Sequence, residues 1–236
     1  MILPFSAGVL NCVKKYNISF EGLRFHNVIG FIKGAFKFCL SQLFLSLKNY
    51  SPIMLISLLG GYTIAGQYKI IEQIIMTFRT YLQVVFRFFY PRLCYEMYKD
   101  KIRGIKYWKK VNFSNLILII SLLSIVYLFS ENILIFFKVE RINLISLGKI
   151  LKYSLLIPLL ITISFTLEQL LFSLGKKDIY IKITISTVII NFVMMFVLFK
   201  KFELYGLISS LLITEIMVIS LYAVFIKIIL KPNNSK

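Results

Sequence analysis

The sequence predicts an all-α integral membrane protein, a bundle of six membrane-spanning helices. Of its 236 residues, 58% are hydrophobic, and the mean hydropathy is +0.82. A soluble domain has an apolar share of only about 45–50%. Apolar runs long enough to cross a hydrocarbon core of about 30 Å recur along the whole chain. Because these runs are continuous and do not alternate with a period of two, they favour helices over barrel strands.

Six stretches have the length of a membrane span, which is about 20 residues for a helix that rises 1.5 Å per residue. The expected spans are residues 36–60, 66–90, 114–137, 150–174, 179–199 and 205–230. They give three regions. Residues 1–34 form a leading segment that starts as a short apolar helix stub, residues 35–231 form the six-span lobe, and residues 232–236 form a tail.

Lysines and arginines between the spans predict the orientation. One side of the expected topology carries eighteen of them, and the other side carries five. The eighteen are Lys14, Lys15, Arg24, Lys33, Lys37, Arg92, Lys99, Lys101, Arg103, Lys106, Lys109, Lys110, Lys176, Lys177, Lys182, Lys227, Lys231 and Lys236; the five are Lys138, Arg141, Lys149, Lys200 and Lys201. Basic loops stay on the cytoplasmic side. Both termini and the loop over residues 92–110 are therefore expected in the cytoplasm.

The expected second span is unusually polar for a membrane helix. At 100° per residue, one stripe gathers its polar side chains, with Arg79 at the edge of the stripe, and the opposite face is apolar. The stripe consists of Lys69, Glu72, Gln73, Met76, Thr80, Gln83 and Arg87. A charge at the bilayer centre costs roughly 2.5–3.5 kcal/mol, so four charges facing lipid cost about 10 kcal/mol. We therefore expect the stripe to face protein or a wet cavity.

Two interpretations of these charges stay open: a polar cavity that handles a substrate, and structural pairing with neighbouring helices. Lys69 and Arg87 lie near the ends of the span, where long side chains reach the interface. Lys69 is also three residues from Glu72, a spacing that allows a helical ion pair. Neither explanation accounts for Arg79, which lies near the middle of the span.

Other spans supply further candidates. Lys48 and Asn49 interrupt the first span, and the carboxylates Glu168 and Glu215 lie inside the fourth and the sixth. A carboxylate within a membrane is a candidate for ion handling or for pairing with a cation, here Arg79 or Lys48. The candidate cavity residues are thus Lys48, Lys69, Gln73, Arg79, Gln83 and Arg87, and the candidate ion-coupling residues are Glu72, Glu168 and Glu215.

Two residues within the spans have expected structural roles. Pro158 should kink the fourth span, because proline removes a helical hydrogen bond. Asn191, inside the fifth span, should hydrogen-bond between helices. Nothing in the sequence suggests an enzyme: it has no paired aspartates, no histidine–cysteine cluster and no glycine-rich phosphate loop. We expect no catalytic residue, metal or cofactor, and no nucleic-acid partner, since the basic residues lie between apolar runs.

Several stretches resemble bacterial polysaccharide flippases. These are GGYTIAGQYKIIEQI at residues 60–74, FFYPRLCYEMYK at residues 88–99, and the stretch over residues 167–216, which holds a Gly-Lys turn, a Tyr-Gly helix start and Glu215. The family is the Wzx-type exporters of O-antigen units, within the MATE-like (multidrug/oligosaccharidyl-lipid/polysaccharide) superfamily. The resemblance covers roughly residues 35–230.

The resemblance implies a fold of two lobes, each of about six helices, around a central cavity that opens alternately to either side. This chain matches the second, C-terminal lobe, with the stub over residues 1–12 as the tail of the sixth family helix. The implied partners are a missing N-terminal lobe or second chain, membrane lipids and a polysaccharide polymerase. The implied location is the bacterial inner membrane.

The implied substrate is an oligosaccharide on undecaprenyl pyrophosphate, an O-antigen or capsule unit moved to the outer leaflet. Arginine forks and lysine charges suit pyrophosphate, and Glu215 or Glu72 would carry a coupling cation. Two alternatives stay open. One is half of a drug/cation antiporter, in which carboxylates should predominate in the cavity. The other is a non-transporting or truncated scaffold of a glycan assembly complex.

Overall fold

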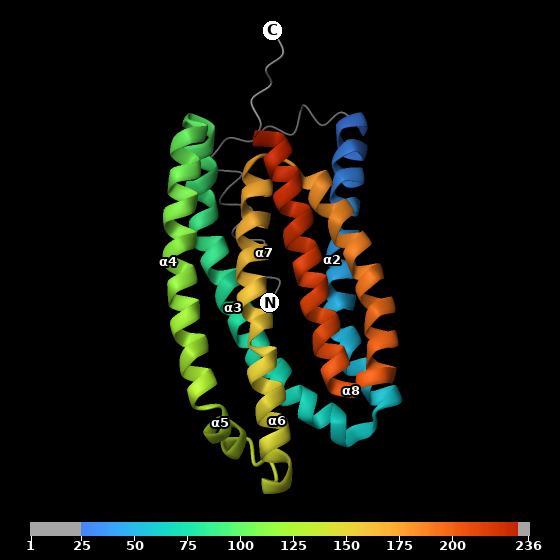
Figure 1. Cartoon of the computed structure of the whole chain (residues 1–236). Coiled ribbons are helices and arrows are strands. Elements are labelled where there is room, and N and C mark those ends of the chain that lie inside the picture. Colours follow the sequence, from blue (N-terminus) through green and yellow to red (C-terminus); the bar gives the residue numbers. More distant parts are fainter. Residues whose placement is uncertain (1–24, 231–236) are drawn as a thin grey trace, which may run out of the picture. The chain divides into compact units, whose positions relative to one another are not determined.

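The computed structural model describes residues 25–230, and this part of the chain is helical apart from short turns (Figure 1). The predicted stub over residues 1–12 and the tail over residues 232–236 lie outside the described residues. The chain divides into two units, Met1–Leu40 and Ser41–Lys236, and each is described by itself. The described part of the first unit is the beginning of one long helix.

The predicted all-helical class is confirmed. The helices are α2 (Phe25–Leu59), α3 (Gly61–Lys99), α4 (Lys101–Leu128), α5 (Ser130–Phe136), α6 (Arg141–Ser154), α7 (Leu156–Ser173) and α8 (Lys177–Leu230). Every expected span falls on one or two of these helices. Most helices extend beyond the expected spans: α2 begins at Phe25, within the predicted leading segment, and α3 continues to Lys99.

Helix α8 is a hairpin that holds the fifth and sixth expected spans. As a straight helix its 54 residues would be roughly 80 Å long, but the backbone breaks at Glu203, with φ 46° and ψ −127°. A side chain at Gly206 would clash with the carbonyl oxygen of Leu198, so the turn needs glycine there. Asn191 donates to Thr214 Oγ1 over 2.8 Å, from one arm to the other. This contact confirms the predicted role of Asn191.

The fourth expected span is divided between α6 and α7. The two helices meet at Leu155, which keeps a helical backbone with φ −63° and ψ −16°. Three residues later stands Pro158. Its ring nitrogen has no hydrogen to donate to the carbonyl of Ser154, four residues earlier. The interruption therefore lies where Pro158 was predicted to disturb the helix.

Three helical segments of residues 25–230 are long and apolar enough to cross a membrane. They are α4, the nearly continuous pair α6–α7 (Arg141–Ser173), and α8. Helix α3 is not among them, and its charges explain why. Glu72, Arg79 and Arg87 interrupt the apolar residues of α3 and shorten its apolar run. The six expected spans are thus present as helical segments. Three segments, of which α8 is a hairpin, are long and apolar enough to cross a membrane.

Within the unit Ser41–Lys236, the turns gather at two ends of the helix bundle (Figure 1). The α3–α4 turn, the α7–α8 turn and the end of α8 lie at one end, which we call the basic end because Lys99, Lys101, Lys176 and Lys177 stand there. The α2–α3 turn, α5 and the break in α8 lie at the other end (Figure 1). The structure therefore sorts these turns into the two groups that the loop charges predicted.

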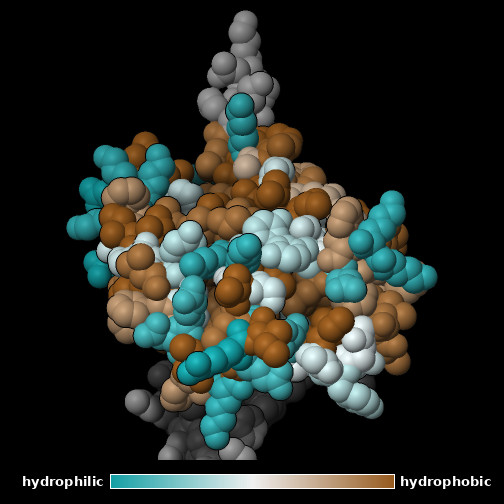
Figure 2. All heavy atoms as spheres, turned by 60° about the horizontal axis from the view of Figure 1, so that its bottom comes forward, coloured by the Kyte–Doolittle hydropathy of each residue, from teal (hydrophilic) through white to brown (hydrophobic). Residues whose placement is uncertain are grey.

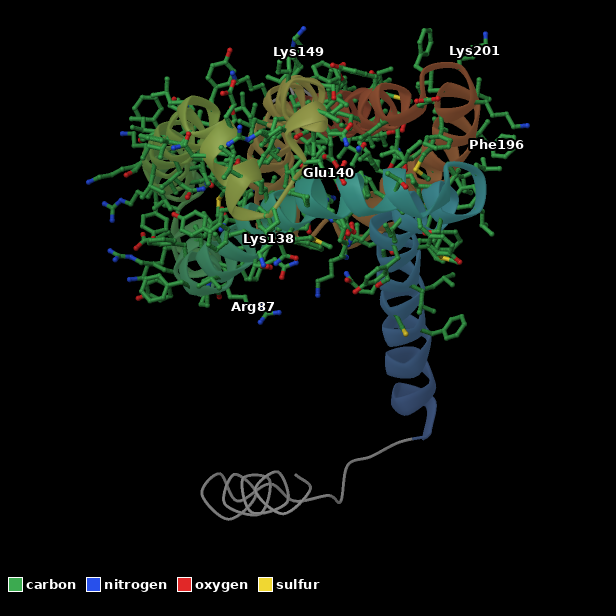
Figure 3. All side chains as sticks on the ribbon, turned by 90° about the horizontal axis from the view of Figure 1, so that it is seen from below. Arg87, Lys138, Glu140, Lys149, Phe196 and Lys201 are labelled. Atoms are coloured by element: carbon green, nitrogen blue, oxygen red, sulfur yellow. The ribbon has the colours of Figure 1, made fainter. Side chains whose placement is uncertain are left out.

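The end opposite the basic end also carries lysines, but fewer. Lys149 and Lys201 point away from the helices there (Figure 3). Figure 2 shows hydrophilic side chains projecting from this end and mostly hydrophobic side chains on the flank above it. Two apolar clusters fill the interior: a larger one joins α3, α6, α7 and α8 around Ile71, Leu151 and Leu207, and a smaller one lies around Leu93 and Tyr222.

Candidate functional site

A buried ion pair joins α2 to α8. Lys48 Nζ lies 2.6 Å from Glu215 Oε1, and the two side chains are only 9% and 7% exposed. The second carboxylate oxygen of Glu215 accepts a hydrogen bond of 3.1 Å from the hydroxyl of Ser164, on α7. Of the two partners expected for Glu215, the structure thus selects Lys48 and not Arg79. Removing either member of such a buried pair strands the other charge.

Local sequence shapes the backbone around Lys48. Pro52 lies within α2, four residues after Lys48, and has no N–H to donate to the Lys48 carbonyl. The hydroxyl of Ser51 donates to that carbonyl over 3.2 Å instead. Side-chain bonds of this kind replace backbone bonds where a helix is interrupted. The proline thus leaves α2 locally open at the residue that carries the buried ammonium.

Arg79 on α3 faces the same region. Its Nη1 donates to the side-chain oxygen of Asn49, the neighbour of Lys48. Its Nε is buried and has no hydrogen-bond partner among the described residues. A guanidinium carries five N–H donors, and a buried donor without an acceptor costs about 1–3 kcal/mol. Arg79 is therefore a partly buried cation with donor capacity left over.

The ion pair that the spacing on α3 allows is present. Lys69 Nζ lies 2.7 Å from Glu72 Oε2. The side chain of Lys69 is 61% exposed, whereas that of Glu72 is 6% exposed. The long lysine side chain thus reaches from the exposed surface to a buried carboxylate, and the structural pairing left open for Lys69 is the one that is found.

A small cavity lies between these charged groups. It is about 30 Å³ in volume, enough for roughly one water molecule. Its lining consists of Lys48, Asn49, Pro52, Tyr68, Glu72, Ile75, Met76, Arg79, Ile157, Leu211 and Glu215. Four of the predicted site residues, Lys48, Glu72, Arg79 and Glu215, therefore meet around one space. In this conformation the space admits water but no larger ligand. We call Lys48, Glu72, Arg79 and Glu215 the charged cluster.

The rest of the polar stripe on α3 lies elsewhere. Gln73, Gln83 and Arg87 are exposed, and Arg87 points away from the other helices (Figure 3). The face turned inward is apolar and includes Ile71 and Leu82. Burying each large apolar side chain contributes about 1.5–3 kcal/mol, so this face determines how α3 is rotated. The stripe is therefore divided: Glu72 and Arg79 border the interior, and the glutamines and Arg87 do not.

Glu168, the third candidate carboxylate, is half-buried on α7, one helical turn after Ser164. It takes part in none of the ion pairs found among residues 25–230. The structure thus places it apart from the contacts of the charged cluster, on the same helical face as the serine that bonds Glu215.

Two residues of the site were missed from the sequence. Tyr68 is buried and lines the cavity, and its place one helical turn before Glu72 was an available signal. Ser164 had none, because a serine inside an apolar helix usually bonds its own backbone. The Ser164 hydroxyl oxygen also lies 3.1 Å from the Ile161 carbonyl oxygen, so its single hydrogen is shared between that carbonyl and Glu215. Only the fold brings α7 and α8 together at this point.

A second polar group, also unpredicted, joins α4 to α7. Asn112 donates to Gln169 Oε1 over 3.1 Å and accepts from the hydroxyl of Thr166 over 3.1 Å. Trp108 Nε1 donates to the backbone carbonyl of Thr166 over 2.9 Å. All of these groups are neutral, so this layer fixes the two helices against each other without adding charge.

Chemically, the charged cluster offers a fixed cation, two paired carboxylates and room for water. Comparison of the chain with protein families, with curated proteins and with solved structures finds no match. The residues and their geometry are therefore the basis for inferring a function.

Proposed function

We propose that the chain is one membrane-embedded lobe of a flippase that moves an oligosaccharide on undecaprenyl pyrophosphate outward across the bacterial inner membrane. One observation carries the proposal. Arg79, near the middle of a helix in an apolar bundle, borders a small cavity that Lys48, Glu72 and Glu215 also line, and keeps a buried Nε without a partner among the described residues. The resemblance of residues 60–74, 88–99 and 167–216 to the Wzx-type family agrees with it.

A membrane location is supported by the outer surface of the helices. Large apolar side chains lie exposed along α4 and α8, among them Ile117, Ile125, Phe192 and Val193. Soluble proteins rarely expose contiguous apolar areas of more than a few hundred Å². In a bilayer, the basic end would stay in the cytoplasm. Lys149 and Lys201, at the opposite end, would then face outward.

The charges around the cavity favour an anionic substrate. Lys48 neutralises Glu215, and Lys69 neutralises Glu72, which leaves Arg79 as the cation without a carboxylate partner among the described residues. A guanidinium binds phosphate oxygens through parallel hydrogen bonds. An antiporter for cationic drugs would need a carboxylate that is free to bind the cation. Both carboxylates that line the cavity are paired, and Glu168, which is in no ion pair among residues 25–230, does not line it. The cavity beside Arg79 therefore favours an anion over a cationic drug.

The exposed part of the α3 stripe suggests a second lobe. Gln73, Gln83 and Arg87 would face lipid if nothing covered them, and Arg87 alone would then cost up to roughly 3 kcal/mol unless it reached the interface. A partner lobe against α3 would cover them and widen the small space beside Arg79 into a path. The membrane potential, negative inside, would favour outward movement of the pyrophosphate charge.

The test is restoration of surface polysaccharide in a flippase-deficient strain. The chain is expressed alone, and together with a separately expressed first lobe of a Wzx-type flippase. Restoration is expected only with the first lobe, because the path needs both walls. Failure of both combinations at normal protein level would contradict the flippase function. Restoration by the chain alone would contradict the need for a second lobe.

A further inference from the structure

An apolar groove lies between α4 and α7. Its volume is about 560 Å³, within the range of about 300–1,000 Å³ typical of ligand sites. Phe113 and Leu116 of α4 and Ile163 and Leu167 of α7 are among its apolar lining residues. The groove is separate from the charged cluster, and none of its lining residues lines the cavity beside Arg79.

Two lysines and a tryptophan lie at one end of this groove. Lys109 and Lys110 line it and are both exposed, and neither pairs with a carboxylate among the described residues. Trp108, half-buried, is fixed by its hydrogen bond to the Thr166 carbonyl. Tryptophan and lysine are the side chains that favour the level of lipid headgroups. The groove is therefore apolar along α4 and α7 and cationic at its rim.

We propose that this groove holds one anionic phospholipid of the surrounding membrane. An acyl chain lies against Phe113, Leu116 and Leu167, and the headgroup phosphate contacts the ammonium groups of Lys109 and Lys110. Charge complementarity decides the occupant. A purely apolar helix on this face would leave both lysines without an acceptor, whereas basic residues at a membrane surface attract anionic lipid. The inference rests on the proposed membrane location but not on the transported substrate.

The chain contains a built-in probe for this site, because Trp108 is its single tryptophan. Phospholipids with brominated acyl chains quench tryptophan fluorescence on contact. The full chain is reconstituted in bilayers with brominated phosphatidylglycerol, which is anionic, or with brominated phosphatidylcholine, which is zwitterionic. We expect the anionic lipid to occupy the groove with about tenfold preference at low salt. Added salt should reduce that preference, because exposed charges are screened.

Two double variants separate the lysines of the groove from the general charge of the basic end. Lys109→Ala with Lys110→Ala should abolish the preference for phosphatidylglycerol while leaving the Trp108 emission maximum unchanged. The control, Lys176→Ala with Lys177→Ala, removes the same charge from the α7–α8 turn, outside the groove, and should keep the preference. Ile163→Phe should fill part of the groove and reduce quenching by both lipids.

Three outcomes would overturn the inference. Equal quenching by the two lipids would show that the groove does not select charge. An unchanged preference in the Lys109/Lys110 variant would place the lipid elsewhere. If the Lys176/Lys177 control lost the preference for phosphatidylglycerol equally, the preference would come from the overall charge of the basic end and not from the groove. Quenching by neither lipid, from a chain that does not incorporate into the bilayers, would instead contradict the membrane location and, with it, the proposed function.

Discussion

The ammonium of Lys48 lies 2.6 Å from the carboxylate of Glu215, although 167 positions separate the two residues in the chain. This pair ties α2 to the second arm of α8, and Ser164 adds a hydrogen bond from α7. Three helices thus converge on one carboxylate. The pair also leaves Arg79 with Asn49, a neutral side chain, as its partner. Stability and substrate binding should therefore depend on different residues of the charged cluster.

The buried pair gives the first prediction. Lys48→Met or Glu215→Gln alone should reduce the free energy of unfolding by about 3–5 kcal/mol, because each variant leaves the charge of the other residue buried without its partner. The double variant should recover most of that loss, since both charges are then gone. The measurement is the fraction of protein that stays folded after heating in detergent.

Arg103→Met is the matched control for this cycle. Arg103 and Asp100 form a pair of 3.7 Å whose side chains are 77% and 44% exposed, and an exposed pair contributes only about 0–1 kcal/mol. Its loss should hardly change the melting curve. If the Lys48/Glu215 double variant loses as much stability as the two single variants added together, the pair does not act as a unit.

The α8 hairpin gives the second prediction. Gly206→Ala should lower stability by at least about 1–3 kcal/mol, as overpacking does, because the new methyl group meets the carbonyl oxygen of Leu198. The control is Gly66→Ala on α3, where a methyl group meets nothing within 4 Å and should add up to about 1 kcal/mol of helix stability. Thermal unfolding in detergent measures both. Equal behaviour of the two variants would contradict the close approach at the hairpin.

The orientation gives the third prediction. In a chain whose own cysteines are replaced, cysteines introduced at Lys149 and Lys201 should react with an impermeant thiol reagent in cells with an intact inner membrane. Cysteines at Lys106 and Lys177 should react only after that membrane is permeabilised. The reason is the concentration of basic residues at the basic end, which keeps those turns in the cytoplasm. Labelling of Lys106 from outside would overturn this topology.

Asn49 gives the fourth prediction. It accepts from Arg79 Nη1 and should act as a positioning residue for the guanidinium. Asn49→Ala should reduce export in the two-lobed transporter while protein level stays near normal, because it removes one hydrogen bond of Arg79 and leaves the ion pairs Lys48–Glu215 and Lys69–Glu72 intact. The loss should be smaller than that caused by removing Arg79 itself. A fall in protein level in proportion to export would show that Asn49 has a merely structural role.

The helical class and most helix positions were predictable because they depend on local properties. A continuous apolar run of about 20 residues specifies a helix whatever it packs against. The stretch KKFELYG at residues 200–206 separates two such runs, so the two arms of the α8 hairpin were predictable as two spans. The residue that absorbs the turn was not, since Glu203 adopts a positive φ that non-glycine residues rarely adopt.

The partners within the site were harder to predict because they depend on how the helices are rotated and placed. Helical spacing identified Lys69 with Glu72, which are three residues apart. It left Glu215 with two possible cations, and only the fold selects Lys48. The stripe on α3 was expected to turn inward as a whole. The burial of Ile71, Phe78 and Leu82 instead rotates it so that Gln73 and Gln83 are exposed.

The role of Arg79 is tested by the export of lipid-linked oligosaccharide by Arg79→Ala in the two-lobed transporter, measured as surface polysaccharide against the amount of protein in the membrane. Export should be lost at near-normal protein level, because Arg79 has no carboxylate partner among the described residues that its removal would strand. Arg79→Lys should recover only part of it, since a point charge replaces a planar fork. Normal export by Arg79→Ala at normal protein level would contradict the proposal that Arg79 lines the path of an anion.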